Sequence, residues 1–395
     1  MRIAIFADNF YPEMSGITDT VITTGKELAR RGHQVDYFAP YYTPDNFRVG
    51  GIKFAELNLG PNVTVHRSMS VPFAAPTKQG RAGLPNLTRA LFDRTKYDVV
   101  HTQSFFGVGL DALLFAKLRG IPLVGTNHTL IDAFVQYSPI KAQWVTTVLT
   151  KFLIWYYNRC EYISTPSLFL LSDMQSKGLK RPGEALSNPI DEAFYQARAD
   201  KATLKQELGL SPFTILYVGR LSAEKNPKAL LNGFITFSAS HPEAELVFVG
   251  QGTMRPELEY LAGTSEAADR IKFAGPFLGE NKQSLYDYFH ASDCFVMPST
   301  SETQSMCTLQ AMCAGLPILA ARAGALPELV GTNKGLIFEP DNESEIASLL
   351  DQLYQDPNKR TAFGQAGRAF AERFHPGLIA AKWEEIFTNA IKYHG

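Results

Sequence analysis

The sequence predicts an α/β protein made of two doubly wound domains, and two observations carry this prediction. Short apolar runs such as "RIAIFAD" and "YDVVHTQ" are followed by a loop and then by a stretch with helical periodicity, so strands and helices alternate. The same alternation restarts at "FTILYVGRLS", near the middle of the 395 residues. Because alternating strands and helices form parallel sheets with right-handed crossovers, each series is typical of a Rossmann-like domain.

The first series is expected over residues 1–195. Its opening strand "RIAIFAD" precedes a loop and the helical stretch "TDTVITTGKELARRGHQ", which Gly32 ends, and "VDYFAP" follows as the second strand. Further buried strands are expected at "YDVVHTQ", "IPLVGTNH" and "EYISTPS". Polar residues replace the apolar rhythm around residues 188–210, which predicts the joint between the domains.

The second series is expected over residues 196–377. Its strands are "FTILYVGRLS", "AELVFVGQG", "IKFAGPF", "CFVMPST", "LPILAARAG" and "GLIFEP". The last helix, residues 378–395, has no strand after it, and we expect it to pack back on the first domain.

Length and composition agree with this organisation. A chain of 395 residues is too long for one core, and 45% hydrophobic with 19% charged residues is typical of a soluble globular protein. The four cysteines lack metal-ligand spacing, so buried reduced thiols are expected. The first apolar run is too short for a signal peptide, and no stretch is long enough for a membrane-spanning helix. We therefore expect a cytoplasmic protein.

The net charge of −1 is unevenly distributed. Residues 1–197 hold 20 Lys/Arg against 16 Asp/Glu, and the remainder holds 18 against 23. Most of the first excess lies between Arg67 and Lys96, where six cations accompany one acid. This segment is either a solvated face or a cationic surface for an anionic membrane. A nucleic-acid partner is not expected, because no basic stripe with stacking aromatics recurs.

Ligands of doubly wound sheets bind at the carboxyl ends of the strands, so the loops there are candidate sites. Neither series has G-x-G-x-x-G after its first strand, which argues against a dinucleotide oxidoreductase. In "DNFYPEMSGITDT", Gly16 either brings backbone amides to a phosphate at a helix start or forms a simple tight turn. In "YVGRLSAEKNPKALL", Arg220 and Lys225 with a helix N-terminus suit a diphosphate. Lys225 could instead pair with Glu224 at the surface, whereas Arg220 is expected at a buried strand end.

Taken in order, the motifs "NFYPEMSG", "DVVHTQ", "GTNHT", "VGRLSAEKN", "VGQG" and "SETQSMCTLQ" resemble glycosyltransferase family 4 over nearly the whole chain. The resemblance implies the GT-B fold, two Rossmann-like domains that face each other across a cleft. It also implies retaining transfer from a nucleotide sugar held by the C-terminal domain. Three segments resemble the branch of the family that glycosylates diacylglycerol: "ETQ", "HTQSFFGVGLDA" and "TNHTLIDAF".

The resemblance assigns roles to the "SETQSMCTLQ" stretch. Glu302 matches a glutamate that binds hydroxyls of the transferred sugar, and Gln310 replaces a second glutamate that binds the ribose. Eight residues of helix would advance about 12 Å, roughly the span from sugar to ribose. An amide at this position keeps hydrogen bonds and loses a charge-assisted part of about 1 kcal/mol. Gln304 and Ser305 stand where the family has Phe-Gly, whose amides approach the donor.

Other roles follow from the same resemblance. His128 matches a histidine beside the donor sugar, although a core histidine bonded to the backbone is the alternative. The base of the nucleotide, uracil or guanine, is expected near Gly275, Pro276 and Phe277. As the bond to phosphate breaks, Arg220, Lys225 and the Gly16 amides would stabilise the leaving diphosphate. No Asp-x-Asp pair lies at a strand end, so no metal and no cofactor beyond the nucleotide sugar is expected.

Three functions stay open. The leading one is a retaining hexosyltransferase that acts on a membrane lipid such as diacylglycerol, peripheral at the inner face of the membrane. The aromatic stretch of residues 141–163, flanked by Lys141, Lys151 and Arg159, would then lie at a lipid interface or line an acceptor pocket, although a core helix is equally compatible. The second is the same chemistry on a soluble or polyprenyl-linked acceptor. The third is a nucleotide-sugar-binding protein without catalysis, which Gln310 and the missing Phe-Gly pair favour.

Overall fold

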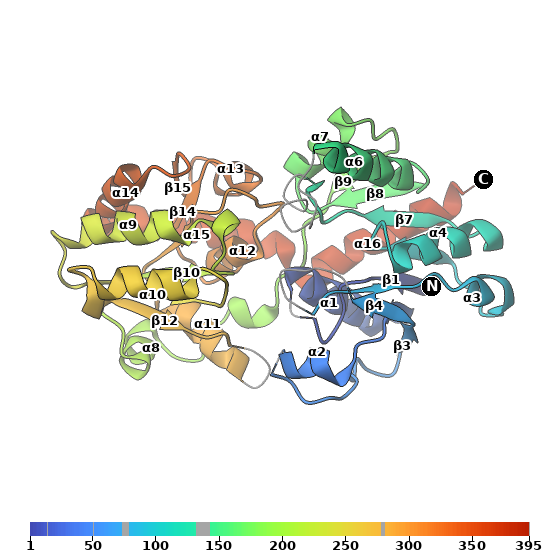
Figure 1. The fold of residues 1–395 in the computed structure, drawn as a ribbon, viewed down its shortest axis with the longest axis horizontal. Helices are drawn as coiled ribbons and strands as arrows, with labels where there is room; N and C mark the ends of the chain where they lie inside the picture. The colour runs from blue at the N-terminus through green and yellow to red at the C-terminus, as the bar shows by residue number, and fades with distance from the viewer. Residues whose placement is uncertain (14, 50, 73–78, 132–142, 278–280, 395) are drawn as a thin grey trace. The chain divides into compact units, whose positions relative to one another are not determined.

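The computed structural model describes residues 1–13, 15–49, 51–72, 79–131, 143–277 and 281–394. The chain folds into two compact α/β units (Figure 1). The first unit joins Met1–Pro189 with Pro376–Gly395, and the second is Ile190–His375. The C-terminal helix therefore belongs to the first unit.

The joint lies slightly earlier than the expected position at residues 195 and 196. The 3₁₀ turn η2 (Glu192–Phe194) is part of the second unit. The Phe194 ring contacts Tyr286 and Phe289 edge-on, with centroids 4.6 and 5.4 Å apart. Burial of this aromatic ring assigns η2 to the second unit, and the boundary lies inside the polar stretch of residues 188–210.

The first unit is built on a parallel seven-stranded sheet in the order β3-β2-β1-β6-β7-β8-β9. A two-stranded antiparallel ribbon, β4 with β5, accompanies it. The strands are β1 (Arg2–Phe6), β2 (Gln34–Pro40), β3 (Val63–Ser68), β4 (Ser70–Pro72), β5 (Arg81–Gly83), β6 (Val99–Thr102), β7 (Leu123–Thr126), β8 (Tyr162–Thr165) and β9 (Gly183–Ala185). The helices are α1 (Gly16–Arg30), α2 (Pro44–Val49), α3 (Leu87–Phe92), α4 (Val108–Arg119), α6 (Gln143–Tyr157), α7 (Leu168–Ser176) and α16 (Pro376–Lys392).

The second unit is built on a parallel six-stranded sheet in the order β12-β11-β10-β13-β14-β15. Its strands are β10 (Phe213–Val218), β11 (Ala244–Val249), β12 (Ile271–Ala274), β13 (Cys294–Met297), β14 (Ile318–Ala321) and β15 (Gly335–Phe338). Its α-helices are α8 (Lys201–Leu208), α9 (Pro227–Ser238), α10 (Arg255–Gly263), α11 (Lys282–Ala291), α12 (Met306–Cys313), α13 (Leu326–Val330), α14 (Glu343–Gln355) and α15 (Pro357–Ala371). Among the described residues, this unit also has the 3₁₀ turns η3 (Ala223–Lys225), η4 (Ala268–Arg270) and η6 (Glu372–Phe374).

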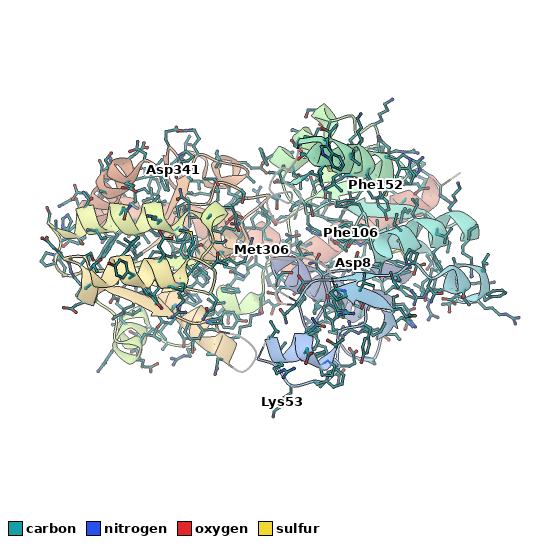
Figure 2. The ribbon with its side chains drawn as sticks, viewed as in Figure 1. Asp8, Lys53, Phe106, Phe152, Met306 and Asp341 are labelled. Carbon is teal, nitrogen blue, oxygen red and sulfur yellow. The ribbon has the colours of Figure 1, made fainter. Side chains whose placement is uncertain are left out.

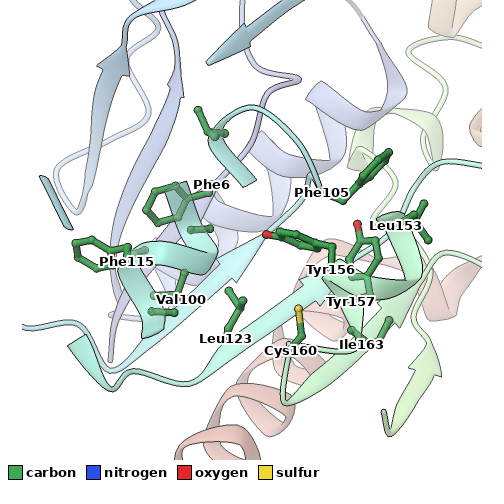
Figure 3. Packing of buried hydrophobic residues seen from close by; sticks show 14 of the residues in the cluster. Phe6, Val100, Phe105, Phe115, Leu123, Leu153, Tyr156, Tyr157, Cys160 and Ile163 are labelled. Carbon is green, nitrogen blue, oxygen red and sulfur yellow. The ribbon is translucent and has the colours of Figure 1, made fainter. Parts of the chain in front are cut away.

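A continuous apolar cluster holds the first unit together (Figure 3). The central strands are buried on both faces, which is why they read as unbroken apolar runs rather than as alternating patterns. Phe115 of α4 and Leu153, Tyr156 and Tyr157 of α6 pack into this cluster. The Tyr156 hydroxyl donates to the Gly109 carbonyl at 2.6 Å, so its polar atom is also satisfied.

The C-terminal helix α16 is fixed to α1 by charged contacts. The Arg31 guanidinium donates from Nε and Nη2 to the two Glu384 carboxylate oxygens, at 2.9 and 2.7 Å. The His33 ring lies 2.7 Å from the same carboxylate. These hydrogen bonds, above all the one from Arg31, lower the pKa of Glu384 to about 2.

Replacing Glu384 with glutamine is expected to lower the free energy of unfolding of the first unit by about 1 kcal/mol at neutral pH. Because the folded pKa of Glu384 is depressed, this contribution is present above pH 5 and is lost as the pH falls towards 2. All three tryptophans, Trp144, Trp155 and Trp383, lie in the first unit, so tryptophan fluorescence in urea follows its unfolding. Glu385→Gln, which removes an exposed pair with Lys382, is the matched control and should change little.

Candidate functional site

The first component of the candidate site follows β10 in the second unit. The strand ends at Val218, and the Arg220 guanidinium lies 3.1 Å from the Glu224 carboxylate. The Tyr217 hydroxyl donates to the Arg220 carbonyl at 2.7 Å and fixes the turn. The expectation of a buried Arg220 is wrong, since its side chain is 39% exposed. Two residues beyond the strand, the chain has already left the core, which makes the guanidinium accessible to an anion.

The second component is an ion pair between distant parts of the unit. Lys225 ends η3, and its Nζ lies 2.6 Å from the Glu302 Oε1. Both side chains are largely buried, with 15% and 11% exposed. Lys225 does not form the surface pair with Glu224 that the sequence also allowed. The two motifs that the sequence presents separately therefore form one site at the carboxyl edge of the sheet.

The loop that carries Glu302 is held by backbone contacts. The Thr300 N–H donates to the Glu224 carbonyl at 3.0 Å, and the Ala325 N–H donates to the Glu302 carbonyl at 2.9 Å. Gly324 has φ 54°, and a Cβ there would lie 2.3 Å from the Glu302 carbonyl oxygen. Only glycine fits this close approach, so Gly324 supports the position of Glu302.

The expected eight-residue helical span from Glu302 to Gln310 is wrong. α12 begins at Met306, labelled in Figure 2, so the first part of the span is a loop. Ser305 has φ 74°, the left-handed region that favours glycine, and its hydroxyl lies 2.8 Å from that of Thr308. Ser305 thus adopts a backbone conformation that glycine would reach without strain. Gln304 and Ser305 are buried, and Gln310 is half-buried on α12.

The expected base-binding residues lie at the end of β12. Gly275 has φ 70°, the Gly275–Pro276 peptide is cis, and the Phe277 ring stacks on Tyr288 with centroids 5.4 Å apart. Arg255 Nη1 donates to the Gly250 and Gly275 carbonyls, each at 3.2 Å. Arg255 ties the ends of two neighbouring strands together, and sequence reasoning missed it because nothing local marks that role.

The two glycines of "VGQG", Gly250 and Gly252, allow two loops of the second unit to approach each other closely. A Cβ on Gly250 would lie 2.0 Å from the Gly219 carbonyl oxygen. A Cβ on Gly252 would lie 2.1 Å from the Leu221 carbonyl oxygen. Both glycines allow the loop after β11 to pass directly beside the loop that carries Arg220.

In the first unit, His128 follows β7 and belongs to a buried polar chain. Its Nε2 lies 2.6 Å from the Gln103 Oε1, and the Gln103 amide nitrogen lies 3.3 Å from the His101 Nε2. The His101 Nε2 lies 2.8 Å from the Thr126 hydroxyl. Burial lowers the pKa of His128 to about 4 and that of His101 to about 3, so both rings are neutral at physiological pH. The sequence did not single out Gln103, although it stands in the quoted "DVVHTQ".

If His128 serves the reaction, Gln103→Leu is expected to reduce kcat by about tenfold or more. A group that loses its correct orientation beside the reacting atoms slows the reaction by at least this factor. With Gln103 Oε1 as acceptor, the His128 Nε2 carries the ring proton. Loss of this acceptor frees the ring to change tautomer and orientation, which ¹⁵N NMR of the imidazole would detect. An unchanged tautomer together with unchanged kcat would contradict a positioning role for Gln103.

Gly16 is the first residue of α1 and is exposed. Ser15 caps the helix, because its hydroxyl accepts a hydrogen bond from the Thr18 N–H at 3.2 Å. Since the first amides of a helix have no partner within the helix, this turn is suited to an anion. Gly16 and His128 thus lie in the first unit, and Arg220, Lys225 and Glu302 lie in the second.

Asp8, labelled in Figure 2, is a further polar residue that the sequence did not assign. It follows β1 and is 2% exposed. Its Oδ1 accepts hydrogen bonds from the Gly83 N–H at 2.9 Å and the Val108 N–H at 3.2 Å, linking β5 to the start of α4. Burial raises the pKa of Asp8 to about 7.

Asp8→Asn is expected to remove a pH dependence from the stability of the first unit. Because the folded pKa is raised from 3.8, the Asp8 contribution is fully present below pH 4 and is lost as the pH rises to about 7, by up to about 4 kcal/mol. The variant should therefore gain stability relative to the wild type between pH 5 and 8, measured by urea unfolding with tryptophan fluorescence. Asp45→Asn, an exposed carboxylate, should show no such trend.

The basic segment is less exposed than its sequence suggested. Arg67 bonds Glu56 and the Pro40 carbonyl, and Arg89 bonds the buried Asp111. Arg94 and Lys96 remain exposed, whereas Lys78 lies outside the described residues. Arg67 and Arg89 are drawn inward because a buried guanidinium needs an anion or carbonyl partner, and each finds one inside the unit. The segment is thus partly structural, and the cationic surface is smaller than expected.

The arrangement of the potential metal ligands and of the thiols agrees with no metal centre among the described residues. Within the described ranges, no group of three or more His, Cys, Asp or Glu side chains could hold a metal ion. Cys160, Cys294 and Cys313 are buried free thiols, and Cys307 is half-buried. In the part of the chain that the structure describes, no helix has the length and apolarity to cross a bilayer.

The fold resembles that of solved glycosyltransferases. Sucrose-phosphate synthase from Thermosynechococcus elongatus superposes with a TM-score of 0.76 at 19% identity, covering 99% of each chain. HepE of Anabaena, solved in complex with UDP-glucose, gives a TM-score of 0.74 at 18% identity, covering 98% of this chain and 100% of that one. The two Rossmann-like units therefore have the GT-B fold.

The sequence has curated relatives along its whole length. Alpha-monoglucosyldiacylglycerol synthase of Streptococcus pneumoniae is 29% identical over 98% of this chain and 87% of the relative. The protein of the same name from Acholeplasma laidlawii is 26% identical over 99% of this chain and 98% of the relative. D-inositol 3-phosphate glycosyltransferase of Corynebacterium kroppenstedtii is 25% identical over 99% of this chain and 90% of the relative.

Family models match both units. Residues 14–194 match the model described as Glycosyltransferase Family 4, and residues 200–370 match the model described as Glycosyl transferases group 1. The chain is a glycosyltransferase and belongs to glycosyltransferase family 4.

Proposed function

We propose that this glycosyltransferase transfers a hexose, with retention of anomeric configuration, from a UDP- or GDP-sugar to a membrane lipid such as diacylglycerol. The observation that carries the proposal is the Lys225–Glu302 ion pair, which lies beside the Arg220 turn in the second unit. In this largely buried pair, Lys225 provides a cation that can bind a diphosphate, and Glu302 provides a carboxylate that can bind sugar hydroxyls.

The chemistry follows from the charge that develops on the leaving group. When the bond from the anomeric carbon to phosphate breaks, negative charge grows on the diphosphate, and Lys225 and Arg220 stabilise it. Glu302 accepts hydrogen bonds from sugar hydroxyls, and the Ser305 amide approaches the donor through its left-handed backbone. The leaving phosphate takes the acceptor proton, and Lys225 and Arg220 supply the positive charge that a metal ion would otherwise provide, so we propose a reaction without a metal or a cofactor. His128 is neutral and offers a hydrogen bond beside the sugar rather than a charge.

The remaining donor contacts are proposed from the resemblance to the family. Gln310 on α12 bonds the ribose hydroxyls, and the backbone at Gly275, Pro276 and Phe277 contacts the base. The Gly16 amides of α1 act on the diphosphate. HepE, of the same fold, binds UDP-glucose, which supports a nucleotide sugar as the donor here.

A lipid acceptor is favoured by the relatives. Two curated proteins that match this chain along nearly its whole length are named for the glucosylation of diacylglycerol. A protein that acts on such a lipid works at a bilayer surface, so we propose a peripheral position at the inner face of the membrane. The alternative is a soluble acceptor, which the relative named for D-inositol 3-phosphate supports.

The test is a transfer assay with purified protein. Diacylglycerol in detergent micelles and inositol phosphate in solution are offered separately with UDP-glucose, UDP-galactose and GDP-mannose, and the products are identified by mass spectrometry. A hexosyl lipid supports the proposal, and a hexosyl inositol phosphate supports the alternative. Failure of every donor with both acceptors, with no release of nucleotide, would favour a binding protein without catalysis.

A further inference from the structure

The helix α6 has two faces of opposite character. Leu153, Tyr156 and Tyr157 point into the core cluster (Figure 3), and the Tyr157 hydroxyl donates to the Thr126 carbonyl at 2.8 Å. The opposite face is exposed, with Trp144 64% and Trp155 43% accessible. The sequence left open whether this stretch is a core helix or an interfacial one. In the structure one face of α6 packs in the core and the other is exposed.

The exposed face is a continuous stripe along the helix. Trp144, Val148, Lys151 and Trp155 are separated by four, three and four residues, and this spacing places them on one side of an α-helix. All four are exposed. We call these four residues the outer stripe of α6. A single exposed apolar side chain is ordinary, but apolar residues gathered on one exposed face are typical of interaction sites.

The charges around the outer stripe are cationic. Lys151 lies within it, and the Arg159 guanidinium stacks on the Trp155 ring, 3.8 Å from its centroid. α6 contains no aspartate or glutamate. On the following helix α7, Asp173 is neutralised by Lys177 at 2.9 Å. The stripe therefore presents tryptophan with lysine and arginine, and no acid within the helix opposes an anionic partner.

This combination matches the interface of an anionic bilayer. Tryptophan prefers the headgroup level of a membrane because its ring is apolar and its N–H is polar, while lysine and arginine attract anionic headgroups. Phe152, labelled in Figure 2, stacks on Trp155 with centroids 5.5 Å apart and supports its ring from the side of the core. The Tyr156 hydroxyl bonds Gly109 of α4 and the Tyr157 hydroxyl bonds Thr126 of β7, so α6 is tied to the rest of its unit on the face opposite the stripe.

We propose that the outer stripe of α6 docks the protein on an anionic lipid bilayer, with the Trp144 and Trp155 rings at the headgroup level. The inference deepens the proposed function, since it assigns the surface that would bring a lipid acceptor and the first unit together. It differs from the cationic segment between Arg67 and Lys96, in which Arg67 and Arg89 are occupied by internal contacts.

The first experiment measures binding of the full chain to vesicles. Sedimentation with vesicles of phosphatidylglycerol and phosphatidylcholine is compared for the wild type and for a Trp144→Ser, Trp155→Ser double variant. We expect at least tenfold weaker partitioning for the double variant. Tyr260→Ser, which removes an aromatic side chain that is 70% exposed on the second unit, is the control and should bind as the wild type does. Vesicles of phosphatidylcholine alone should bind more weakly, because Lys151 and Arg159 then lack an anionic partner.

A second readout identifies which tryptophans meet the lipid. Lipids with brominated acyl chains quench nearby tryptophans, and we expect them to quench Trp144 and Trp155 while Trp383, which is buried, remains fluorescent. Wild-type protein that ignores anionic vesicles, or a double variant that binds them as tightly, would overturn the proposal. A wild-type dimer that the double variant dissociates, without any vesicle binding, would assign the stripe to a second copy of the chain and overturn it as well.

Failure of docking and failure of the proposed function are distinguishable. In detergent micelles the diacylglycerol acceptor reaches the protein without a bilayer. The double variant should therefore keep its micellar activity and lose its activity on vesicles. Vesicle binding with no transfer in micelles would retain the docking surface and reject the lipid acceptor.

Discussion

Replacing Lys225 with alanine is expected to lower kcat for sugar transfer by about two to three orders of magnitude. In the proposed mechanism the Lys225 ammonium faces the charge that develops on the diphosphate, and it does so from a largely buried position where solvent screens it little. The variant should show a smaller change in KM, because the charge is greatest in the transition state. Steady-state kinetics with the productive donor measure both quantities.

Two controls separate this effect from a loss of structure. Lys228→Ala removes an exposed lysine three residues along the chain, which pairs with Glu257 at the surface, and its kinetics should match the wild type. Lys225→Ala also leaves the Glu302 carboxylate without its ion pair, so its melting temperature must be compared with that of the wild type. Wild-type kcat in a folded Lys225→Ala protein would contradict the assignment.

Arg89→Met is expected to destabilise the first unit by about 3–5 kcal/mol. Arg89 bonds Asp111 at 2.8 Å, and the Asp111 side chain is fully buried. Its Oδ1 has no hydrogen-bond partner in the described part of the chain. Burial raises the pKa of Asp111, and Arg89 opposes this shift. Without Arg89 the carboxylate is more costly to ionise, so the loss of stability should be larger at pH 8 than at pH 5.

Urea unfolding followed by tryptophan fluorescence measures this loss, since every tryptophan lies in the first unit. Adding Asp111→Asn to the Arg89→Met variant should recover part of the stability, because a neutral amide costs less to bury than a carboxylate. Arg94→Met, five residues along the same segment and exposed, should change stability by less than about 0.5 kcal/mol. An equal loss of unfolding free energy for Arg89→Met and Arg94→Met would contradict a stabilising role for the buried Arg89–Asp111 pair.

The alternation of strands and helices was readable from the sequence because fully buried parallel strands leave unbroken apolar runs. "RIAIFAD" and "FTILYVGRLS" each contain an inner strand of a parallel sheet, β1 and β10. The carboxyl-edge location of Arg220 and Lys225 followed from the same pattern, since loops after parallel strands meet at one edge.

Pairings between distant residues were not readable. The Lys225–Glu302 pair joins positions 77 residues apart, and no local pattern specifies it. The sequence suggested that Arg89 is a surface cation, because nothing near it in the chain indicates its ion pair with the buried Asp111. The left-handed conformation of Ser305 was also hidden, since serine rarely adopts it and tertiary contacts impose it here.

The most direct test of the central claim is the structure of the product formed from UDP-glucose and diacylglycerol, determined by NMR of the purified lipid. The proposed function predicts a monoglucosyl lipid whose anomeric proton has the small coupling constant of an α-glucoside, the configuration of the donor. A β-glucoside would contradict retention. No glucolipid at all, together with glucosylated inositol phosphate when that acceptor is supplied, would contradict the lipid acceptor and leave the glycosyltransferase assignment in place.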